Sequence, residues 1–382
     1  MTTSADYRLG EYRFARGWFA VGASSELSSK PLNARYFGED VVLYRGASGA
    51  PVMLSAYCAH MGTHLGRSTS SHTVLSGQQI DGDSIRCPFH GWRWGPDGVC
   101  NEIPYYDGEI PRGARIRSWP TAERFGIVFC WNDPEGLAPD FDLPEIEEWH
   151  DPAWIAHEEP QHLVDLPCHP IEVFDNNSDW AHLRYTHGGP AGKYENEIDG
   201  TRYHQRQSLV SEVEAHDSND INLDAFGGDA ATPPTITTFN YYNGPGMNVI
   251  QFVELHARQI ILVTPTEDAS LRMWQTVALK RPENATDDEA VAALNALSQS
   301  LAFGLATQDG EIWSNKRPAL TVMAVPTDGP FRHARKWYSQ FFNPRDKAPA
   351  IVDKIAGTYH VRGVPGLPMP VAGSDVHDAL VP

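Results

Sequence analysis

Two cysteines and two histidines form the first group of residues that could do chemistry. They occur as Cys58-Ala-His60 and Cys87-Pro-Phe-His90, and each half follows a strand-like run and is trailed by a glycine. Thiolates and neutral imidazoles are ligands of both zinc and iron–sulfur clusters. In a Rieske [2Fe–2S] cluster two thiolates hold one iron and two imidazoles hold the other, which raises the reduction potential. The mixed pairing favours such a cluster.

A structural zinc site is the competing interpretation, because two cysteines with two histidines are also a zinc ligand set. A C-x-H half-site is unusual for zinc, and the matching glycine context of both halves disfavours coincidence. The 26 residues between His60 and Cys87 are tolerable for a cluster held by two hairpin loops, whose connecting chain can wander. We interpret His64 and His72 in that stretch as loop histidines.

A second group has the pattern Asn176-x-x-Asp179-x-x-His182-x-x-x-x-His187. Two imidazoles five residues apart do not share one face of a regular helix. We expect them to converge because the helix distorts or ends between them, as the Gly-Gly-Pro sequence after His187 encourages. Two histidines and one carboxylate form the facial triad of non-haem Fe(II), which leaves positions for O₂ and substrate.

The carboxylate of this triad has to come from elsewhere in the chain. We choose Asp309, within the stretch Gln308–Trp313, and Glu311 is the competitor. Taken alone, each of them fits ordinary surface polarity equally well. Asp179 has a different predicted role, because a carboxylate that hydrogen-bonds a ligand imidazole orients the ring and tunes the metal.

The elements that must position these groups fall into two parts. Residues 17–131 are rich in short apolar runs separated by turn residues, which predicts strands. Asp133-Pro-Glu-Gly136 breaks that pattern, so we place a domain boundary near Asn132 and expect an N-terminal segment 1–16, a first domain 17–131 and a second domain 132–382. The predicted strands of the first domain are Trp18–Val21, Asp40–Tyr44, Val52–Ala56 and Ile127–Trp131.

The second part mixes helices and strands. Ile171–His187 has a helical composition, and Thr286–Lys316 predicts a long helix with Thr286 as its N-cap. The polar segment Asp217–Pro234 is long for a loop and is predicted to be mobile or a lid. Four consecutive antiparallel strands are expected at Thr235–Tyr242, Val249–Leu255, Gln259–Pro265 and Ser270–Lys280.

Composition excludes several classes of protein. Of 382 residues, 41% are hydrophobic and 21% charged, which is ordinary for a globular chain. The net charge of −19 is uneven: +1 over residues 1–16, 0 over 17–124 and −20 over 125–382. Nucleic acid and anionic membrane are disfavoured partners, since both need clustered basic residues. Five cysteines do not suggest a disulfide framework, the start of the chain lacks a signal peptide, and Leu294–Ala306 is too polar and short to span a membrane. We expect a cytoplasmic protein.

Together, the two groups resemble the oxygenase (α) components of Rieske non-haem iron oxygenases, with the stretch Asp309–Trp313 as further support. The resemblance implies an α+β fold, with an N-terminal all-β Rieske domain and a C-terminal catalytic domain in which a curved antiparallel sheet is packed with helices. It also implies a head-to-tail homotrimer. Electrons would pass from the cluster of one subunit to the iron of the next, with Asp179 as the bridge.

Within that family the chain is most similar to the 3-ketosteroid 9α-hydroxylases and the cholesterol 7-desaturases. The segment between His60 and Cys87 departs from their pattern by an insertion around Ser68–Gly82. The stretches that carry the similarity are Cys87–Trp94, Asp97–Cys100, Ile103–Tyr105, Trp131–Gly136, Glu311–Trp313, Asp328–Pro330 and Trp337–Tyr338.

The resemblance implies a monooxygenase that uses O₂ to hydroxylate a hydrophobic steroid or polycyclic substrate. The substrate would lie in a cavity under the sheet, walled by apolar residues from Phe239–Tyr242 and Val249–Phe252. NADH electrons would enter through a separate reductase, with or without a ferredoxin, because no dinucleotide-binding glycine motif follows a strand. Desaturation or oxidative demethylation by the same iron is the first alternative. A Rieske electron carrier or redox sensor is the second, and the iron triad argues against it.

Overall fold

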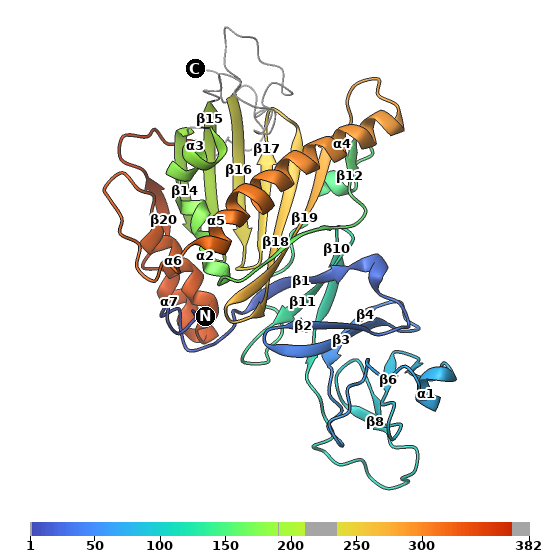
Figure 1. The fold of residues 1–382 in the computed structure, drawn as a ribbon. Helices are drawn as coiled ribbons and strands as arrows, with labels where there is room; N and C mark the ends of the chain where they lie inside the picture. The colour runs from blue at the N-terminus through green and yellow to red at the C-terminus, as the bar shows by residue number, and fades with distance from the viewer. Residues whose placement is uncertain (1, 190, 211–234, 369–382) are drawn as a thin grey trace.

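The computed structural model describes residues 2–189, 191–210 and 235–368 of the chain. Small β-sheets from the first third of the chain lie below a large antiparallel sheet that is covered by helices from the remainder (Figure 1). The predicted α+β fold is therefore confirmed. The segment Asp217–Pro234, for which a mobile segment or a lid is predicted, lies outside the described residues.

Three small sheets build the N-terminal part, and all four predicted strands occur there. They are strands because their apolar side chains are buried, as on β3, where Val41 and Leu43 are fully buried. The first sheet has the order β1 (Gly17–Ala23), β11 (Ile127–Asn132), β10 (Thr121–Arg124). The second has the order β2 (Leu32–Tyr36), β3 (Glu39–Arg45), β4 (Pro51–Ser55), β9 (Ser118–Trp119). The third has the order β5 (Ile80–Asp81), β6 (Ser84–Arg86), β7 (Arg93–Trp94), β8 (Cys100–Glu102).

Two separate apolar cores support the two ends of the molecule. Phe19 on β1 shares a core with Met247 on the large sheet, so the first small sheet packs directly against the C-terminal part. A second core, which contains Trp94, surrounds Cys58 and Cys87. The loops that carry the two cysteines therefore rest on a core of their own.

In the described residues, nine antiparallel strands form the large sheet, which contains all four strands predicted for this half. Strand β13 (Gln161–Leu166) also pairs with β19, at the same edge as β12. The strand order is β12 (Trp154–Ala156), β19 (Ser270–Lys280), β18 (Ala257–Glu267), β17 (Met247–Phe252), β16 (Thr235–Asn243), β15 (Arg202–Val210), β14 (Ala191–Asp199), β20 (Gly357–His360).

Helices cover one face of this sheet, and α4 runs obliquely across its strands (Figure 1). Leu294 and Leu297 on α4 pack into a core with Val277 of β19, which holds the helix on the sheet. The α-helices of this part are α2 (Pro170–Phe174), α3 (Ala181–His187), α4 (Asp287–Ala302), α5 (Gly310–Asn315), α6 (Phe331–Ser339) and α7 (Ala348–Val352). The other short helical turns are η1 (Ser24–Glu26), α1 (His72–Leu75), η2 (Glu147–Trp149), η3 (Asp175–Ser178), η6 (Gln340–Phe342) and η7 (Arg345–Lys347).

The long helix predicted over Thr286–Lys316 is present, but it is not α-helical throughout. Thr286 is its N-cap as predicted, because the Thr286 side chain accepts from the Glu289 backbone N–H and Glu289 bonds back in a capping box. Between α4 and α5 the chain forms a π-helical segment, η5 (Phe303–Asp309), which the sequence pattern did not predict. Such segments are rare and occur frequently at functional sites.

The same helical stretch, Asp287–Asn315, is long and apolar enough to cross a membrane by length and composition alone. The sequence prediction considered only Leu294–Ala306 and therefore missed it. One such helix is weak evidence for a membrane span, because core helices of soluble proteins can be as long and apolar. Of the most apolar 18-residue window in this helix, 28% is buried inside the molecule.

The N-terminal segment lies against the C-terminal part and also contacts the first small sheet, where the Asn132 side chain donates to the carbonyl of Ala15 at 2.8 Å. The Ser4 side chain donates to Asp268 at 2.8 Å and lies 3.0 Å from His169 Nε2. The backbone N–H of Arg16 donates to the carbonyl of Phe341 at 2.8 Å. Residues 2–16 thus form a tether that is fixed to the turn between β18 and β19 and to the helices beside the large sheet.

The insertion around Ser68–Gly82 folds into α1 and β5, between the two cysteine-bearing loops in sequence. It is fixed there by Gln79, whose buried side-chain amide donates to the carbonyl of Leu65 at 2.7 Å. The longer chain is therefore accommodated as an ordered extension of the small third sheet.

Candidate metal centres and substrate cavity

Cys58 and Cys87 lie on two loops with the same backbone hydrogen bonds. The N–H of Gly62 donates to the carbonyl of Cys58 at 2.9 Å, and the N–H of Gly91 donates to that of Cys87 at 3.0 Å. Both glycines have positive φ angles, +73° and +76°, which is a conformation that other residues rarely adopt. The glycines that trail the two half-motifs thus allow both loops to turn in the same way.

The four side chains of these loops are arranged as two thiols and two imidazoles. Cys58 and Cys87 are each 2% exposed and share a hydrogen bond, whereas the rings of His60 and His90 lie nearer the surface with centroids 4.9 Å apart. A zinc ion needs all four ligand atoms around one point. The separation into pairs fits a two-iron cluster, with one iron on each pair.

The surroundings of Cys87 favour a thiolate, whereas the same hydrogen bond and burial raise the pKa of Cys58. The hydrogen bond shared with Cys58 lowers the pKa of Cys87 despite its burial, and backbone hydrogen bonds at Phe89 and His90 act in the same direction. The sequence analysis missed Trp92, which stacks on His60 with centroids 4.5 Å apart and an interplanar angle of 6°. The stacking holds the imidazole ring in one plane.

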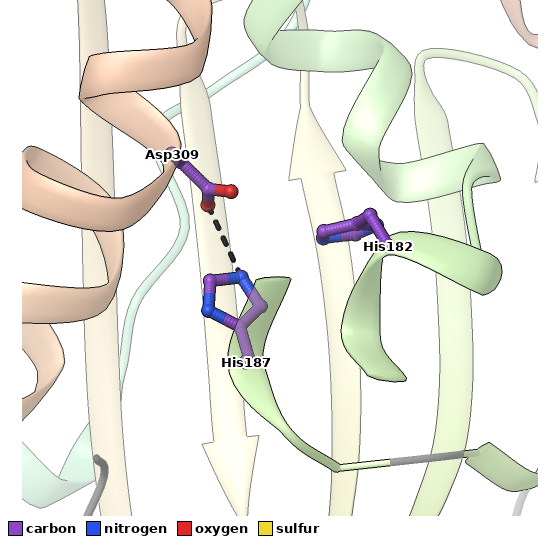
Figure 2. Close-up of side chains that lie close together, drawn as sticks. All are labelled: His182, His187 and Asp309. Atoms are coloured by element: carbon purple, nitrogen blue, oxygen red, sulfur yellow. Dashed lines mark ion pairs between the residues drawn. The ribbon is translucent and has the colours of Figure 1, made fainter. Parts of the chain in front are cut away.

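The second group of residues lies at the large sheet, where α3 and η5 meet. Ligand atoms of His182, His187 and Asp309 all lie within 4.8 Å of one another, a cluster of three that recurs nowhere else in the described part of the chain. Figure 2 shows both rings turned toward the carboxylate of Asp309. The distance from Asp309 Oδ2 to His187 Nε2 is 3.4 Å. Glu311, the competing carboxylate, is exposed on α5 and lies outside this cluster.

The predicted break of the helix between the two histidines is wrong. Both belong to α3, which ends at His187, where Gly188 follows with a φ of +72°. The expected interruption lies earlier, because Asp179 and Trp180 separate η3 from α3. The rings still approach, with centroids 5.4 Å apart, because the two side chains reach toward Asp309 from opposite ends of a short helix (Figure 2).

Each histidine of the second group uses Nδ1 for a contact within the protein. His187 Nδ1 lies 2.9 Å from Gln308 Oε1, which is 121 positions away in sequence, and His182 Nδ1 lies 2.5 Å from the backbone carbonyl of Asp179. Nε2 of both rings then remains for a metal ion. The sequence analysis did not assign Gln308, and its position next to Asp309 is the signal that could have found it.

Asp179 acts differently from the prediction. Its carboxylate Oδ1 lies 4.0 Å from His182 Nδ1 and instead accepts the backbone N–H groups of Ala181 and His182, at 3.1 and 3.3 Å. The predicted bond to the imidazole is made by its backbone carbonyl. The carboxylate is free to cap α3 because the carbonyl already holds the ring.

The charges of the second group suit a cation. Burial lowers the pKa of His182, which keeps that imidazole neutral as a metal ligand must be. Burial also lowers the pKa of His187, but the hydrogen bond and charge of Asp309 outweigh it and raise the pKa above its usual value. A metal cation would take the place of the proton that His187 and Asp309 share.

A cavity of about 910 Å³, counting its open part, begins at these three residues and extends along the sheet. The prediction of apolar walls from Phe239–Tyr242 and Val249–Phe252 is correct only in part. Strand alternation turns Phe239 to the opposite face and presents Asn240 and Asn248 to the cavity. Apolar side chains line the rest, mainly Val173, Ile250, Phe252, Leu301, Leu305 and Trp313.

Both parts of the chain match known protein families. Residues 17–120 match the Rieske [2Fe–2S] domain, and residues 130–342 match the 3-ketosteroid 9α-hydroxylase C-terminal domain. An oxygenase component of 3-ketosteroid-9-alpha-monooxygenase from Mycolicibacterium smegmatis is 31% identical, over 90% of this chain and 86% of the relative. Cholesterol 7-desaturase from Caenorhabditis elegans is 27% identical, over 86% of this chain and 77% of the relative.

Among solved structures, dicamba monooxygenase bound to 3,6-dichlorosalicylic acid aligns with a TM-score of 0.63 at 19% identity, over 89% of this chain and 98% of that one. NdmA from Pseudomonas putida CBB5 with caffeine also aligns with a TM-score of 0.63, at 15% identity, over 91% of this chain and 96% of that one. These likenesses support the fold.

The family matches confirm the predicted cofactors, a Rieske [2Fe–2S] cluster and a mononuclear iron, and the predicted class, a Rieske-type non-haem iron monooxygenase supplied by a separate reductase. An electron carrier or redox sensor is excluded, because the C-terminal match extends over the second metal group. The chain belongs to the Rieske oxygenase components that carry the 3-ketosteroid 9α-hydroxylase C-terminal domain.

Proposed function

We propose that this oxygenase component hydroxylates a steroid or another hydrophobic polycycle held in the cavity of the large sheet. The observation that carries the proposal is that His182, His187 and Asp309, which lie within reach of one another, all line that cavity. The apolar side chains along one wall of the cavity suit the ring system of a polycyclic ligand. The relatives named for 3-ketosteroids and cholesterol support this substrate class.

We also propose the ligands of the two centres. The paired thiols and imidazoles support the cluster set, and the close approach of three ligand atoms supports the iron set. The cluster set is Cys58, His60, Cys87 and His90, and the iron set is His182, His187 and Asp309.

When bound, the two centres supply one-electron transfer and O₂ activation. The residues of the chain position the reactants around them. Gln308 and the carbonyl of Asp179 orient the two imidazoles, and the apolar wall with Leu305 and Trp313 keeps water away from the substrate.

A homotrimer in which the subunits meet head to tail is part of the proposal. In Figure 1 the third small sheet, whose strands adjoin the Cys87 loop, lies at the opposite end of the molecule from α3 and α5. One chain alone therefore keeps its two centres far apart, and a neighbouring copy would have to supply the nearby cluster. Asp179 is a candidate bridge because its side chain is 35% exposed beside His182. A reductase, with or without a ferredoxin, delivers electrons from NADH.

Desaturation or oxidative demethylation is the second candidate reaction. The similarity to cholesterol 7-desaturase favours desaturation in particular. The outcome depends on which bond of the substrate faces the iron, so the same residues serve each reaction. Mass spectrometry separates the three, because hydroxylation adds one oxygen atom, desaturation removes two hydrogens and demethylation removes one carbon.

We further propose the domain limits 1–16, 17–131 and 132–382, with a cytoplasmic location. The chain passes from β11 into the connector at Asn132, which supports the second limit. All five cysteines are free of disulfides, as expected in a reducing compartment. Fractionation of the native cell would test the location.

The proposed function is tested with purified protein, a generic Rieske reductase, NADH and a panel of steroids, bile acids and polycyclic aromatics. We expect about three irons per chain, the sum of a two-iron cluster and one mononuclear site. We also expect substrate-dependent NADH and O₂ consumption, with a product larger by one oxygen atom. Full iron content without oxidation of any polycycle would overturn the substrate class.

A further inference from the structure

The sheet side of the cavity is unexpectedly polar for a site that takes a hydrophobic substrate. Alternation along β16 and β17 presents Thr238, Asn240 and Asn248 to the cavity, and Gln205 and Gln207 on β15 lie beside them in register. All five side chains are at least nine-tenths buried. The cavity therefore has one apolar wall and one wall of amides and a hydroxyl.

Several of these buried groups have no hydrogen-bond partner. The unpaired atoms are Gln207 Oε1, Thr238 Oγ1, Asn240 Oδ1 and Asn248 Oδ1. Buried polar groups in folded proteins are nearly always paired, and each unpaired one is costly. Four such atoms along one wall of a cavity indicate that the partner is something that enters the cavity.

A relay of hydrogen bonds fixes which end of the Asn240 amide is left without a partner. Tyr194 donates its hydroxyl to the backbone carbonyl of Asn177 at 2.9 Å, and a carbonyl can only accept. The Tyr194 oxygen therefore accepts from Gln205 Nε2 at 3.2 Å, and Gln205 Oε1 accepts from Asn240 Nδ2. The remaining Asn240 Oδ1 is an acceptor, and turning the amide over would break the relay.

A second relay, through the side chain of Asn177, fixes the orientation of the Asn248 amide. Asn177 Nδ2 donates to the backbone carbonyl of Phe174, and Asn177 Oδ1 accepts from Asn248 Nδ2, both at 3.4 Å. Asn248 Oδ1 is left as the free end. Both relays begin at a main-chain carbonyl, and both end at an unpaired acceptor of a residue that lines the cavity.

We propose that the substrate is an amphipathic polycycle with hydroxyl groups along one face. Those hydroxyls donate to Asn240 and Asn248, while the bare face packs against Leu305 and Trp313. A ketone at the same positions would set a carbonyl oxygen against an amide oxygen, and neither can donate. This inference rests on the proposed function, since it concerns the same cavity.

The test compares two acids that differ only in the oxidation state of three ring positions. Cholic acid carries three hydroxyls on one face of its ring system, and its 3,7,12-triketo counterpart carries none. Calorimetry with the anaerobic holoenzyme measures both affinities without turnover. We expect the trihydroxy acid to bind at least about tenfold more tightly, which corresponds to about 1.4 kcal/mol.

Variants assign the preference to the two relays. In Asn240→Leu and in Asn248→Leu the ratio of the two affinities should fall toward one, mainly through weaker binding of the trihydroxy acid. Because the relays are independent, either variant suffices if the other does not fold. Gln251→Leu is the matched control, since Gln251 neighbours Ile250 on β17 but faces the other side of the sheet. It should keep the full ratio.

The outcomes separate this inference from the proposed function. Equal affinity for the two acids, or a preference that survives in both asparagine variants, overturns the inference. So does failure of the trihydroxy acid to bind while another polycycle is oxidised. If no polycycle binds or is oxidised, the proposed function fails, and the inference fails with it.

Discussion

The two metal groups of this chain are built in different ways. The cluster group comes from two loops of the same conformation that rest on a small core of their own. The proposed iron group joins α3 to η5, and its His187 contacts Gln308, which lies 121 positions away in sequence. The first group is thus encoded locally, whereas the second depends on how helices pack across the large sheet. Loss of one centre should therefore leave the other in place.

The largest effects should come from removing one ligand of each group. Cys87→Ala should abolish the visible absorption of the cluster and leave about one iron per chain, while His187→Ala should keep the cluster and lose the mononuclear iron. Turnover should fall by about 1,000-fold or more in both variants. Iron analysis and absorption spectra measure the two centres separately. Loss of the cluster in His187→Ala would show that the centres are not separable.

A smaller effect is expected at the residue that orients the iron ligand from a distance. Gln308→Leu removes the acceptor for His187 Nδ1 and should weaken mononuclear iron binding by about 10- to 100-fold, with the cluster spectrum unchanged. Gln299→Leu is the control, because Gln299 is exposed on the same long helix. Titration of iron-depleted protein gives both affinities. Equal affinities would contradict the orienting role.

Asp179 tests how the two centres communicate. An asparagine still caps α3 and leaves the backbone carbonyl on His182 in place, so Asp179→Asn should keep both metals. Turnover should nevertheless fall by about 10- to 100-fold if the carboxylate bridges the subunits. Rapid-mixing measurements should locate the loss in electron transfer from the cluster to the iron. Full turnover with full iron content would remove Asp179 from the bridging role.

The smallest effect concerns the tether that joins the N-terminus to the C-terminal part. Burial lowers the pKa of His169 to about 4, so the folded chain keeps it neutral while the unfolded chain protonates it near pH 6.5. The unfolded state therefore binds more protons as the pH falls, and this histidine should cost about 2 kcal/mol of stability between pH 7 and 5.

Urea denaturation of wild type and His169→Gln at both pH values measures that contribution. Glutamine does not titrate, so the wild type should lose more stability than the variant over this range. Cluster absorption gives a second readout of the same samples. An equal loss in both proteins would mean that the pKa of His169 is the same in the folded and unfolded chains.

The cluster group was easier to predict from the sequence than the iron group, because its residues lie in two short loops. Cys58, His60, Cys87 and His90 stand out in sequence because each pair lies within one short loop with its own glycine. Eight of the strands, four in each half of the chain, and the cap at Thr286 were also predicted, since each is a local pattern. Local patterns are what a single sequence displays most directly.

The contacts that sequence did not reveal are tertiary. Gln308 became recognisable only when η5 was placed against α3, and the use of a backbone carbonyl by Asp179 has no sequence signal. The break predicted between His182 and His187 was wrong. Helix α3 is so short that side chains at its two ends can both reach Asp309 without a break between them. The amide wall with Asn240 was missed because the strand was assessed for its apolar residues alone.

The π-helical segment η5 has a consequence for how chain length can vary in this fold. Removing one residue between Phe303 and Asp309 would restore a regular α-helix, in which each position turns by about 100°. Leu294 and Leu297 would keep their places on β19, while Asp309 would rotate out of reach of the histidines. We therefore expect a single-codon deletion to leave a folded protein without its proposed third iron ligand. Natural insertions and deletions should avoid this turn and accumulate in surface connections such as Ser68–Gly82.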